Sequence, residues 1–377
     1  MRVLLDCRMA TWSGVGRYST GLTRALAAGD DVELVLVCAV GEAPPVAPRT
    51  GAEVVTASAH PFGLLGALEL GRLARQVRPD LVHCHHFPTP LPVRRPLVVT
   101  LHDLTPLFVP GVMPSAVKRA AYRRWNARAV RLADRIIVPS TATAADVTQV
   151  FPKARKRVTV TPEAADDFAL GPIGPLTGAL AELASRPYLL AMASAKPHKD
   201  LGTLLKAFVS LAPPDSGELR LLLVGSEPAG HLDAALGGMP PAVRSRTAFT
   251  GRVTDTELRA LYAGASVFVF PSRREGFGLP PLEAMALGAP VVCADAPPLA
   301  ELAGGAAVLF PAGDAEALAG AVLRVLDDPM LRERLSAAGR ERAAQFSWER
   351  TAAATVAVYR EALHDICSRS TRGKTTG

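Results

Sequence analysis

Short apolar runs alternate with longer segments of helical spacing along almost the whole chain, and this alternation limits the possible folds more than any other feature. Most runs are continuously apolar, such as VFVF at 267–270, and strands of that kind are buried on both faces of a parallel sheet. The order of strands and helices therefore predicts an α/β fold with doubly wound sheets. The predicted strands are 2–6, 32–38, 80–84, 97–101, 135–138, 188–193, 219–225, 267–270, 290–294 and 307–310.

The chain is long enough for two such sheets, because its 377 residues exceed the ~250–300 residues at which a single core stops growing. The alternation breaks between about 152 and 187, where prolines and glycines indicate an interdomain connection. A strong helix follows Ser347, a candidate N-cap, and we expect it to cross back to the first domain. The predicted parts are two Rossmann-like domains at 1–165 and 187–345, a linker at 166–186, the crossing helix at 346–366 and a flexible tail at 367–377.

Composition restricts the location and the partners. Too few apolar residues precede Asp6 for a signal peptide, and no apolar run approaches the ~18 residues of a membrane span. The odd number of scattered cysteines, without a CxxC pair, argues against a disulfide framework or a cysteine zinc site and suits a reducing cytoplasm. We therefore expect a cytoplasmic protein. The cysteines are Cys7, Cys38, Cys84, Cys293 and Cys367.

A net charge of +7 favours anionic partners in general. The segment AVKRAAYRRWNARAVRLADR concentrates this charge, and an anionic membrane surface that the protein binds peripherally is one candidate partner. A solvated basic face, or one paired within the fold, is an equal alternative. Nucleic acid is not expected, because Tyr122 and Trp125 are the only aromatic residues interleaved there. The arginines at helical spacing are Arg124, Arg128, Arg131 and Arg135.

The segment PSRREGFGLPPLEAMALGAPVVCAD reads as loop, helix and strand after the strand at 267–270. Pro280 and Pro281 suit the first helical turn and Gly288 its end, which places Glu275 in the loop and Glu283 in the first turn. Backbone amides before this helix favour an anion, and the two carboxylates favour sugar or ribose hydroxyls. The plainer alternative is a turn with a dipole-complementing glutamate. The outward amides are those of Gly276, Phe277, Gly278 and Leu279.

These residues resemble the retaining family 4 glycosyltransferases of the GT-B fold, whose Glu-x7-Glu signature matches Glu275 and Glu283. The opening DCRMATWSGVGRYSTGL, the segment TLHDLTPL and the closing FSWERTAAATVAVYREAL are similar to that family as well, so the resemblance covers both domains. It implies two Rossmann-like domains facing a central cleft. It also implies that Glu283 binds the nucleotide ribose, whereas Glu275 and the amides after it bind the donor sugar.

Lys199 follows the strand at 188–193 at the start of a helix, where a cation and helix amides suit a diphosphate. A lone lysine there is otherwise solvated surface, but the resemblance implies the diphosphate lysine at this position. Many family members also carry an arginine five residues earlier, and this chain has Ser194. Lys196, or an arginine elsewhere, is the expected substitute.

The loop WSGVGRYSTGL carries Gly14 and Gly16, but Ser19 replaces the third glycine of a dinucleotide fingerprint. The resemblance implies instead that this loop faces the donor phosphate and the acceptor, which the two glycines permit. Arg17 is either a further anion contact or part of a solvated helix face.

His102 and Asp103 follow the strand at 97–101, and we expect Asp103 to orient or charge-stabilise the imidazole. The resemblance implies that His102 contacts the donor sugar near its reacting carbon, so His102 and Glu275 are the predicted catalytic residues. The histidines at 83, 85 and 86 lack further ligands at metal spacing and read as structural. No Asp-x-Asp occurs, so neither a metal nor another cofactor is expected.

The predicted function is transfer of a sugar from a nucleoside diphosphate donor to a hydroxyl of a glycan, lipid or small molecule, with retention of configuration. Mannose from GDP-mannose is the expected donor from the general similarity of the chain. Two alternatives stay open: a nucleotide-sugar epimerase of the same fold, and a non-catalytic protein that binds sugar nucleotides.

Overall fold

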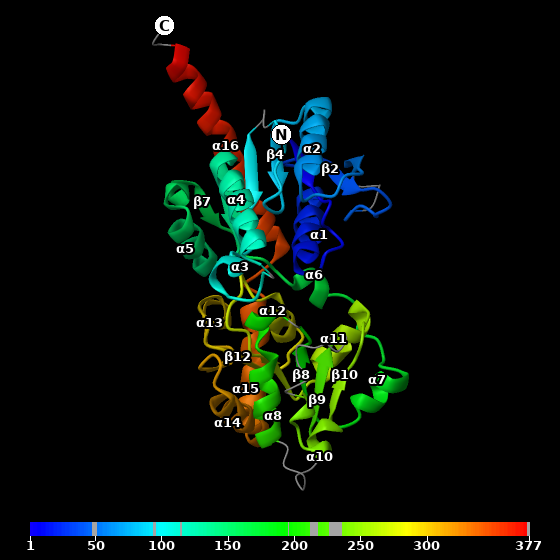
Figure 1. Cartoon of the computed structure of the whole chain (residues 1–377). Coiled ribbons are helices and arrows are strands. Elements are labelled where there is room, and N and C mark those ends of the chain that lie inside the picture. The colour runs from blue at the N-terminus through cyan, green and yellow to red at the C-terminus, as the bar shows by residue number, and fades with distance from the viewer. Residues whose placement is uncertain are drawn as a thin grey trace. The chain divides into compact units, whose positions relative to one another are not determined.

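The computed structural model describes residues 1–46, 51–92, 96–113, 115–194, 196–211, 218–225 and 236–374 (Figure 1). The side chains of Ser13 and of 366–374, including Cys367, lie outside this description. The chain divides into two compact units. The first contains Met1–Leu107, Met113–Ala164 and Ser347–Gly377, and the second contains Phe108–Val112 and Ala165–Phe346.

The first unit is built on a parallel sheet, which confirms the α/β prediction. Among the described residues it has seven strands in the order β3-β2-β1-β4-β5-β6-β7. Val3 of β1 lies opposite Leu34 of β2 on one side and Leu81 of β4 on the other, and all three side chains are buried. The strands are β1 (Arg2–Asp6), β2 (Glu33–Ala39), β3 (Glu53–Ala57), β4 (Leu81–Cys84), β5 (Leu97–Thr100), β6 (Arg135–Val138) and β7 (Val158–Val160).

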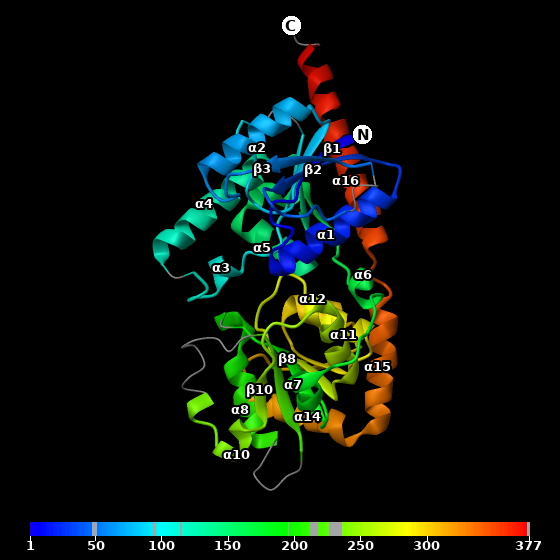
Figure 2. The ribbon, with the colours of Figure 1, turned by 90° about the vertical axis from the view of Figure 1, so that its right-hand side faces the viewer.

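Helices cover both faces of this sheet. Figure 2 shows α1 and α16 on one side of it and α2 and α4 on the other. Crossovers between parallel strands are right-handed, so the connecting helices change face when the chain, after moving from β1 to β3, returns to β4 and continues to β7. The helices are α1 (Ser13–Ala28), α2 (Leu64–Val77), α3 (Thr105–Phe108), α4 (Ala116–Leu132), α5 (Thr141–Val150), the 3-10 helix η2 (Pro152–Arg157) and α16 (Trp348–Lys374).

The C-terminal helix α16 belongs to the first unit, as predicted for a crossing helix. The Ser347 hydroxyl accepts a hydrogen bond from the Arg350 amide and caps its start. A Cβ at Gly21 would lie 2.1 Å from the Trp348 ring, so glycine lets α1 approach this helix. The predicted tail at 367–377 is wrong as far as Lys374, because the helix continues to that residue.

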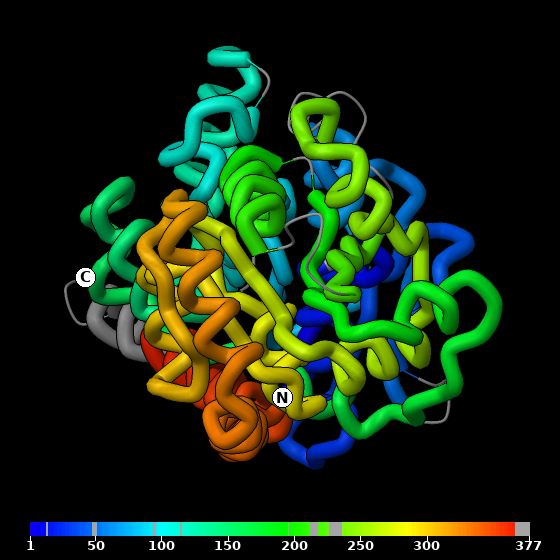
Figure 3. The backbone as a smooth tube through the Cα atoms, turned by 90° about the horizontal axis from the view of Figure 1, so that it is seen from below, coloured from blue at the N-terminus to red at the C-terminus, as the bar shows by residue number. Residues whose placement is uncertain are grey.

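The second unit has a second parallel sheet, with six strands in the described residues in the order β10-β9-β8-β11-β12-β13. Helix α8 packs against α14, and α12 packs against α15 (Figures 1 and 3). Its strands are β8 (Tyr188–Met192), β9 (Arg220–Val224), β10 (Thr247–Phe249), β11 (Val267–Phe270), β12 (Val291–Ala294) and β13 (Val308–Phe310). Its helices are α6 (Asp166–Ala169), α7 (Gly178–Leu183), η3 (Pro197–Lys199), α8 (Leu201–Leu211), α10 (Pro241–Arg244), α11 (Asp255–Gly264), α12 (Leu279–Ala286), α13 (Pro297–Ala303), α14 (Ala315–Asp327) and α15 (Pro329–Ala343).

The predicted linker is fastened to the second unit. It contains α6 and α7, and the Arg259 guanidinium donates hydrogen bonds to the carbonyls of Phe168, at 2.6 Å, and Pro172, at 2.9 Å.

None of the described helices combines the length and the apolar composition needed to cross a membrane.

Candidate functional site

Lys199 and Glu275 meet at the carboxyl ends of two neighbouring strands of the second sheet. Lys199 ends η3 after β8, Glu275 follows β11, and these two strands pair directly. The Lys199 Nζ lies 2.6 Å from Glu275 Oε1, and the two side chains are 23% and 13% exposed. The ammonium also lies 5.2 Å from the centre of the Phe270 ring. A cation and a carboxylate thus face each other at the edge where parallel sheets bind ligands.

The two loops that carry this pair are bonded to each other. The His198 carbonyl accepts hydrogen bonds from the Ser272 hydroxyl at 3.0 Å and the Arg273 amide at 2.8 Å. The Arg273 Nε also lies 2.6 Å from Asp200 Oδ2. These bonds hold Lys199 opposite Glu275. Ser194, where the resemblance implies an arginine, accepts a hydrogen bond from the amide of exposed Lys196 at 3.3 Å.

The start of α12 leaves few amides for a ligand. Gly278 caps the helix with φ +117°, and a Cβ there would lie 2.9 Å from Leu299 Cδ2, so this position requires glycine. Pro280 and Pro281 occupy the first turn, as predicted, and have no N–H. Of the four N–H groups that a helix start leaves without helical partners, those of Gly278 and Leu279 therefore remain. The Phe277 side chain is buried against Phe346, and Gly276 lies between Glu275 and this cap.

Glu283 begins the second turn of α12, so its predicted place in the first turn is wrong. The helix starts at Leu279, directly after the left-handed Gly278, which makes Glu283 its fifth residue. The side chain is 3% exposed, and its Oε2 accepts a hydrogen bond from the Tyr262 hydroxyl at 3.1 Å. Because the macrodipole effect is confined to the first turn, dipole complementation does not account for this buried carboxylate.

Gly14 and Gly16 lie inside the first turn of α1, which begins at Ser13, and not in the loop before it. A Cβ at Gly16 would lie 2.4 Å from the Ala10 carbonyl oxygen, so this glycine admits the turn that follows β1. A Cβ at Gly14 would meet no atom within 4 Å. Of the two glycines, only Gly14 borders open space.

His102 is held by two oxygen atoms in the first unit. Its Nδ1 lies 2.9 Å from Glu163 Oε1, and its Nε2 lies 2.9 Å from the His85 carbonyl oxygen. A carboxylate oxygen and a carbonyl oxygen both accept hydrogen bonds, so these two contacts favour the imidazolium, which carries a proton on each nitrogen. Burial alone would lower the pKa of His102, but the hydrogen bond and charge of Glu163 outweigh it and raise the pKa above its usual value.

Asp103 does not orient the imidazole, but its negative charge contributes to the raised pKa of His102, as the charge-stabilising alternative expects. Its carboxylate accepts a hydrogen bond from the Thr105 amide at 2.7 Å at the start of α3. Glu163 performs the orienting role, and the segment after β7 in which it lies has no periodicity that would indicate it from the sequence.

We expect Glu163→Gln to lower the pKa of His102, because the amide removes the negative charge that favours the imidazolium. In the native protein the pair stabilises the fold fully below the ordinary histidine pKa of ~6.5, and this contribution is lost as the pH rises through the raised folded pKa. An NMR titration of the His102 ring measures the change. Glu349→Gln, an exposed substitution in α16, is the control, and an unmoved His102 titration in Glu163→Gln would contradict the assignment.

The other clustered histidines are structural, as predicted. The His83 nitrogens lie 2.7 Å from the Tyr359 hydroxyl and 2.9 Å from the Thr100 hydroxyl. The His85 Nδ1 lies 2.9 Å from the Ser19 hydroxyl, and burial lowers the pKa of His85 to about 3. Both rings are therefore neutral parts of the core.

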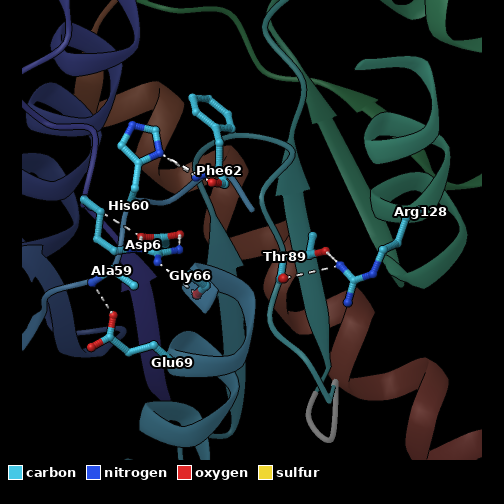
Figure 4. A network of polar contacts seen from close by, with 9 residues as sticks. Asp6, Ala59, His60, Phe62, Gly66, Glu69, Thr89 and Arg128 are labelled. Atoms are coloured by element: carbon cyan, nitrogen blue, oxygen red, sulfur yellow. Dashed lines mark hydrogen bonds and ion pairs between the residues drawn. The ribbon is translucent and has the colours of Figure 1, made fainter. Parts of the chain in front are cut away.

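The predicted arginine face is only partly available. Arg135 lies on β6 and pairs with Asp365 at 2.6 Å and Glu361 at 3.1 Å. The Arg128 guanidinium donates to Thr89 (Figure 4), and it also donates to the Pro90 carbonyl at 2.8 Å. The pairing alternative is therefore correct for these two. Arg124 and Arg131 are exposed on α4, and the membrane contact stays a prediction that rests on them.

Two family models together match most of the chain. Residues 12–167 match the model described as Glycosyltransferase Family 4, and residues 186–328 match Glycosyl transferases group 1.

Three curated relatives show the range of similar proteins. The O-antigen chain mannosyltransferase B of Escherichia coli is 36% identical over 48% of this chain and 47% of its own, so the chain spans about half the length of that relative. The MMP alpha-(1->4)-mannosyltransferase of Mycolicibacterium hassiacum is 32% identical over 72% of this chain and 67% of its own. The glycogen synthase of Mycobacterium tuberculosis is 30% identical over 95% and 94%.

Solved structures share the fold. Sucrose-phosphate synthase from Thermosynechococcus elongatus has a TM-score of 0.75 at 22% identity and covers 96% of this chain and 98% of its own. Anabaena Alr3699/HepE, in complex with UDP and glucose, has a TM-score of 0.71 at 20% identity, with 96% and 99% covered. The fold is therefore GT-B, as predicted.

Proposed function

This chain belongs to glycosyltransferase family 4, and we propose that it transfers a sugar from a nucleoside diphosphate donor to an acceptor hydroxyl with retention of configuration. The pairing of Lys199 with Glu275 at the edge of the second sheet carries the proposal. A cation neutralises the charge that develops on a leaving diphosphate, and a carboxylate accepts hydrogen bonds from sugar hydroxyls. A nucleoside diphosphate sugar requires both.

Donor binding exchanges the partners of this pair. Without donor, Lys199 and Glu275 neutralise each other, so neither of these largely buried side chains carries an unpaired charge. When the donor binds, the ammonium turns to the diphosphate and the carboxylate to the sugar. Glu283, steadied by Tyr262, binds the ribose hydroxyls, and the amides of Gly278 and Leu279 add donors to phosphate oxygens.

Transfer breaks the bond between the anomeric carbon and the leaving phosphate oxygen and forms a bond to the acceptor oxygen on the same face. The acceptor proton passes to the departing phosphate oxygen, which gives a glycoside and a nucleoside diphosphate. Lys199 stabilises the negative charge of that leaving group, and no metal is part of this scheme.

Mannose is the sugar we propose first. Two relatives carry mannosyltransferase names, whereas the glycogen synthase and the structure with UDP and glucose make glucose the second candidate. GDP-mannose and UDP-glucose are therefore the first two donors to test.

Glu283→Gln is expected to weaken donor binding by roughly 10- to 100-fold, because hydrogen bonds to a charged group contribute about 1.5–3 kcal/mol. The amide still accepts a hydrogen bond from Tyr262, so the fold should survive. Isothermal titration with each donor measures the effect. Glu316→Gln, at an exposed position of α14, is the control, and donor binding by Glu283→Gln as tight as wild type would remove the ribose assignment.

Product analysis separates transfer from the other two functions. With wild-type protein, NMR should show an α- or β-glycoside of the donor's own configuration, formed only when acceptor is present. An epimerase would change the donor sugar without acceptor, and a non-catalytic binder would leave a bound donor unchanged.

A further inference from the structure

Three rings of the first unit form an exposed cluster at the carboxyl edge of its sheet. Trp12 lies in the segment between β1 and α1, whereas His60 and Phe62 lie between β3 and α2. The Trp12 ring centroid is 5.9 Å from that of His60 and 5.5 Å from that of Phe62. Trp12 is 37% exposed and Phe62 is 36% exposed. We call these three rings the aromatic platform.

Edge-to-face and tilted ring contacts connect this platform to His102. The Phe62 centroid lies 6.0 Å from that of His86, which in turn lies 5.9 Å from that of His102. One ring therefore separates the platform from the imidazolium, and a ligand on the platform lies along the same sheet edge as His102.

Contacts with α2 anchor the loop that carries His60 and Phe62 (Figure 4). The Glu69 carboxylate accepts hydrogen bonds from the amides of Ser58, at 3.1 Å, and Ala59, at 2.8 Å. Burial would raise the pKa of Glu69, but these amides outweigh it and hold the pKa below its usual value. A Cβ at Gly66 would lie 2.2 Å from the His60 carbonyl oxygen, so glycine lets the loop lie directly on the helix. A preorganised surface loses little entropy on binding.

The chemistry of the platform suits a sugar ring. The His60 Nδ1 lies 3.3 Å from the Phe62 amide nitrogen and 3.5 Å from the Phe62 carbonyl oxygen, so Nδ1 is engaged locally and Nε2 provides a polar edge beside the exposed rings. Next to Trp12, the Thr11 hydroxyl donates to Glu42 at 2.8 Å. Behind Phe62, burial lowers the pKa of His86 to about 3, which keeps that ring uncharged. Open ring faces with polar groups at their rim match the C–H face and the hydroxyl edge of a pyranose.

We propose that the aromatic platform is the acceptor subsite and that the acceptor is a glycan whose terminal sugar stacks on Trp12 and Phe62. The inference rests on the proposed function, because it assigns the acceptor of the same reaction. The apolar alternative is a lipid surface, since Leu64, Leu65 and Leu68 of α2 are exposed nearby in sequence. Those leucines explain neither the polar edge of His60 nor the connection to His102, so the glycan is favoured.

The test uses Trp12→Ala and Phe62→Ala with Trp125→Ala as the matched control, a partly exposed tryptophan of α4 outside the platform. The acceptors are α-mannotriose and maltotriose, each with GDP-mannose and UDP-glucose. Loss of a stacking ring should raise the KM for the accepted oligosaccharide ~10-fold. The KM for donor and the slow hydrolysis of donor without acceptor should stay at wild-type values, and Trp125→Ala should match wild type throughout. An acceptor KM unchanged in both platform variants would overturn the proposal.

A binding measurement without donor keeps this result separate from the proposed function. Tryptophan fluorescence of wild type should change as either trisaccharide is added, and Trp12→Phe should lose most of that change. If wild type consumes no donor, the proposed function fails while this titration still decides the platform. A response to vesicles of phosphatidylglycerol and phosphatidylcholine, with none to either sugar, would overturn the glycan and assign the surface to lipid. Circular dichroism and melting temperatures confirm that each variant is folded.

Discussion

Lys199→Ala is expected to lower kcat/KM for sugar transfer by roughly 10²- to 10³-fold, the usual cost of removing one group that stabilises developing negative charge. The effect should fall mainly on kcat, because the diphosphate carries more negative charge in the transition state than in the bound donor. Initial rates with GDP-mannose or UDP-glucose measure it. Lys206→Ala, which changes an exposed lysine of the following helix α8, should stay within about twofold of wild type.

The salt bridge with Glu275 allows a sharper version of this test. Lys199→Ala leaves the Glu275 carboxylate, which is 13% exposed, without its 2.6 Å partner, and that loss alone could disturb the loop. In the double variant Lys199→Ala with Glu275→Gln no such charge remains. Activity restored by the second substitution would mean that Lys199 only neutralises Glu275, and the diphosphate role would then be wrong.

Asp6→Ala is expected to destabilise the first unit by about 3–5 kcal/mol, because it leaves a buried guanidinium without its counter-ion. Asp6 and Arg8 are each 1% exposed. Arg8 Nε and Nη2 each lie 2.7 Å from a carboxylate oxygen of Asp6, and Nη1 donates to the Gly66 carbonyl (Figure 4). For a unit of this size, the expected fall in melting temperature is roughly 6–20 °C.

The control for Asp6→Ala is Glu33→Ala, which breaks an exposed 2.9 Å pair with Arg2 and should cost about 1 kcal/mol or less. Adding Arg8→Met to Asp6→Ala removes the unpaired charge and should recover part of the loss. A melting temperature of Asp6→Ala equal to that of Glu33→Ala would show that the buried pair does not hold the unit together.

The interior strands of each sheet could be predicted from the sequence, whereas three of the four edge strands could not. Interior strands such as β1 and β11 are covered on both faces and are therefore continuously apolar. The strands β3, β7 and β10 lie at sheet edges, are short or partly exposed, and lack such a run. A continuous apolar run identified the fourth edge strand, β13, although Leu309 is exposed, but the other three offer no such run.

Which residues of the candidate site lie next to each other could not be predicted from the sequence either. The sequence places Lys199 and Glu275 each at the end of a strand, but strand order decides that β8 and β11 are neighbours, and no local pattern encodes it. Glu163 and Tyr262 were missed because their partners, His102 and Glu283, lie far away in the chain. The aromatic platform likewise joins two separate loops, and the sequence around Trp12 does not predict its contact with Phe62.

The return of α16 to the first unit has a consequence for synthesis. His83 bonds Tyr359 at 2.7 Å, and the Thr351 hydroxyl donates to the Pro162 carbonyl at 2.7 Å, so the first unit is complete only when the last part of the chain is present. Most of the second unit is one uninterrupted stretch, Ala165–Phe346. Domains usually mature in the order in which the ribosome releases them, but here the first sheet must wait, with the α16 side only partly covered, until the second unit and α16 itself have been translated.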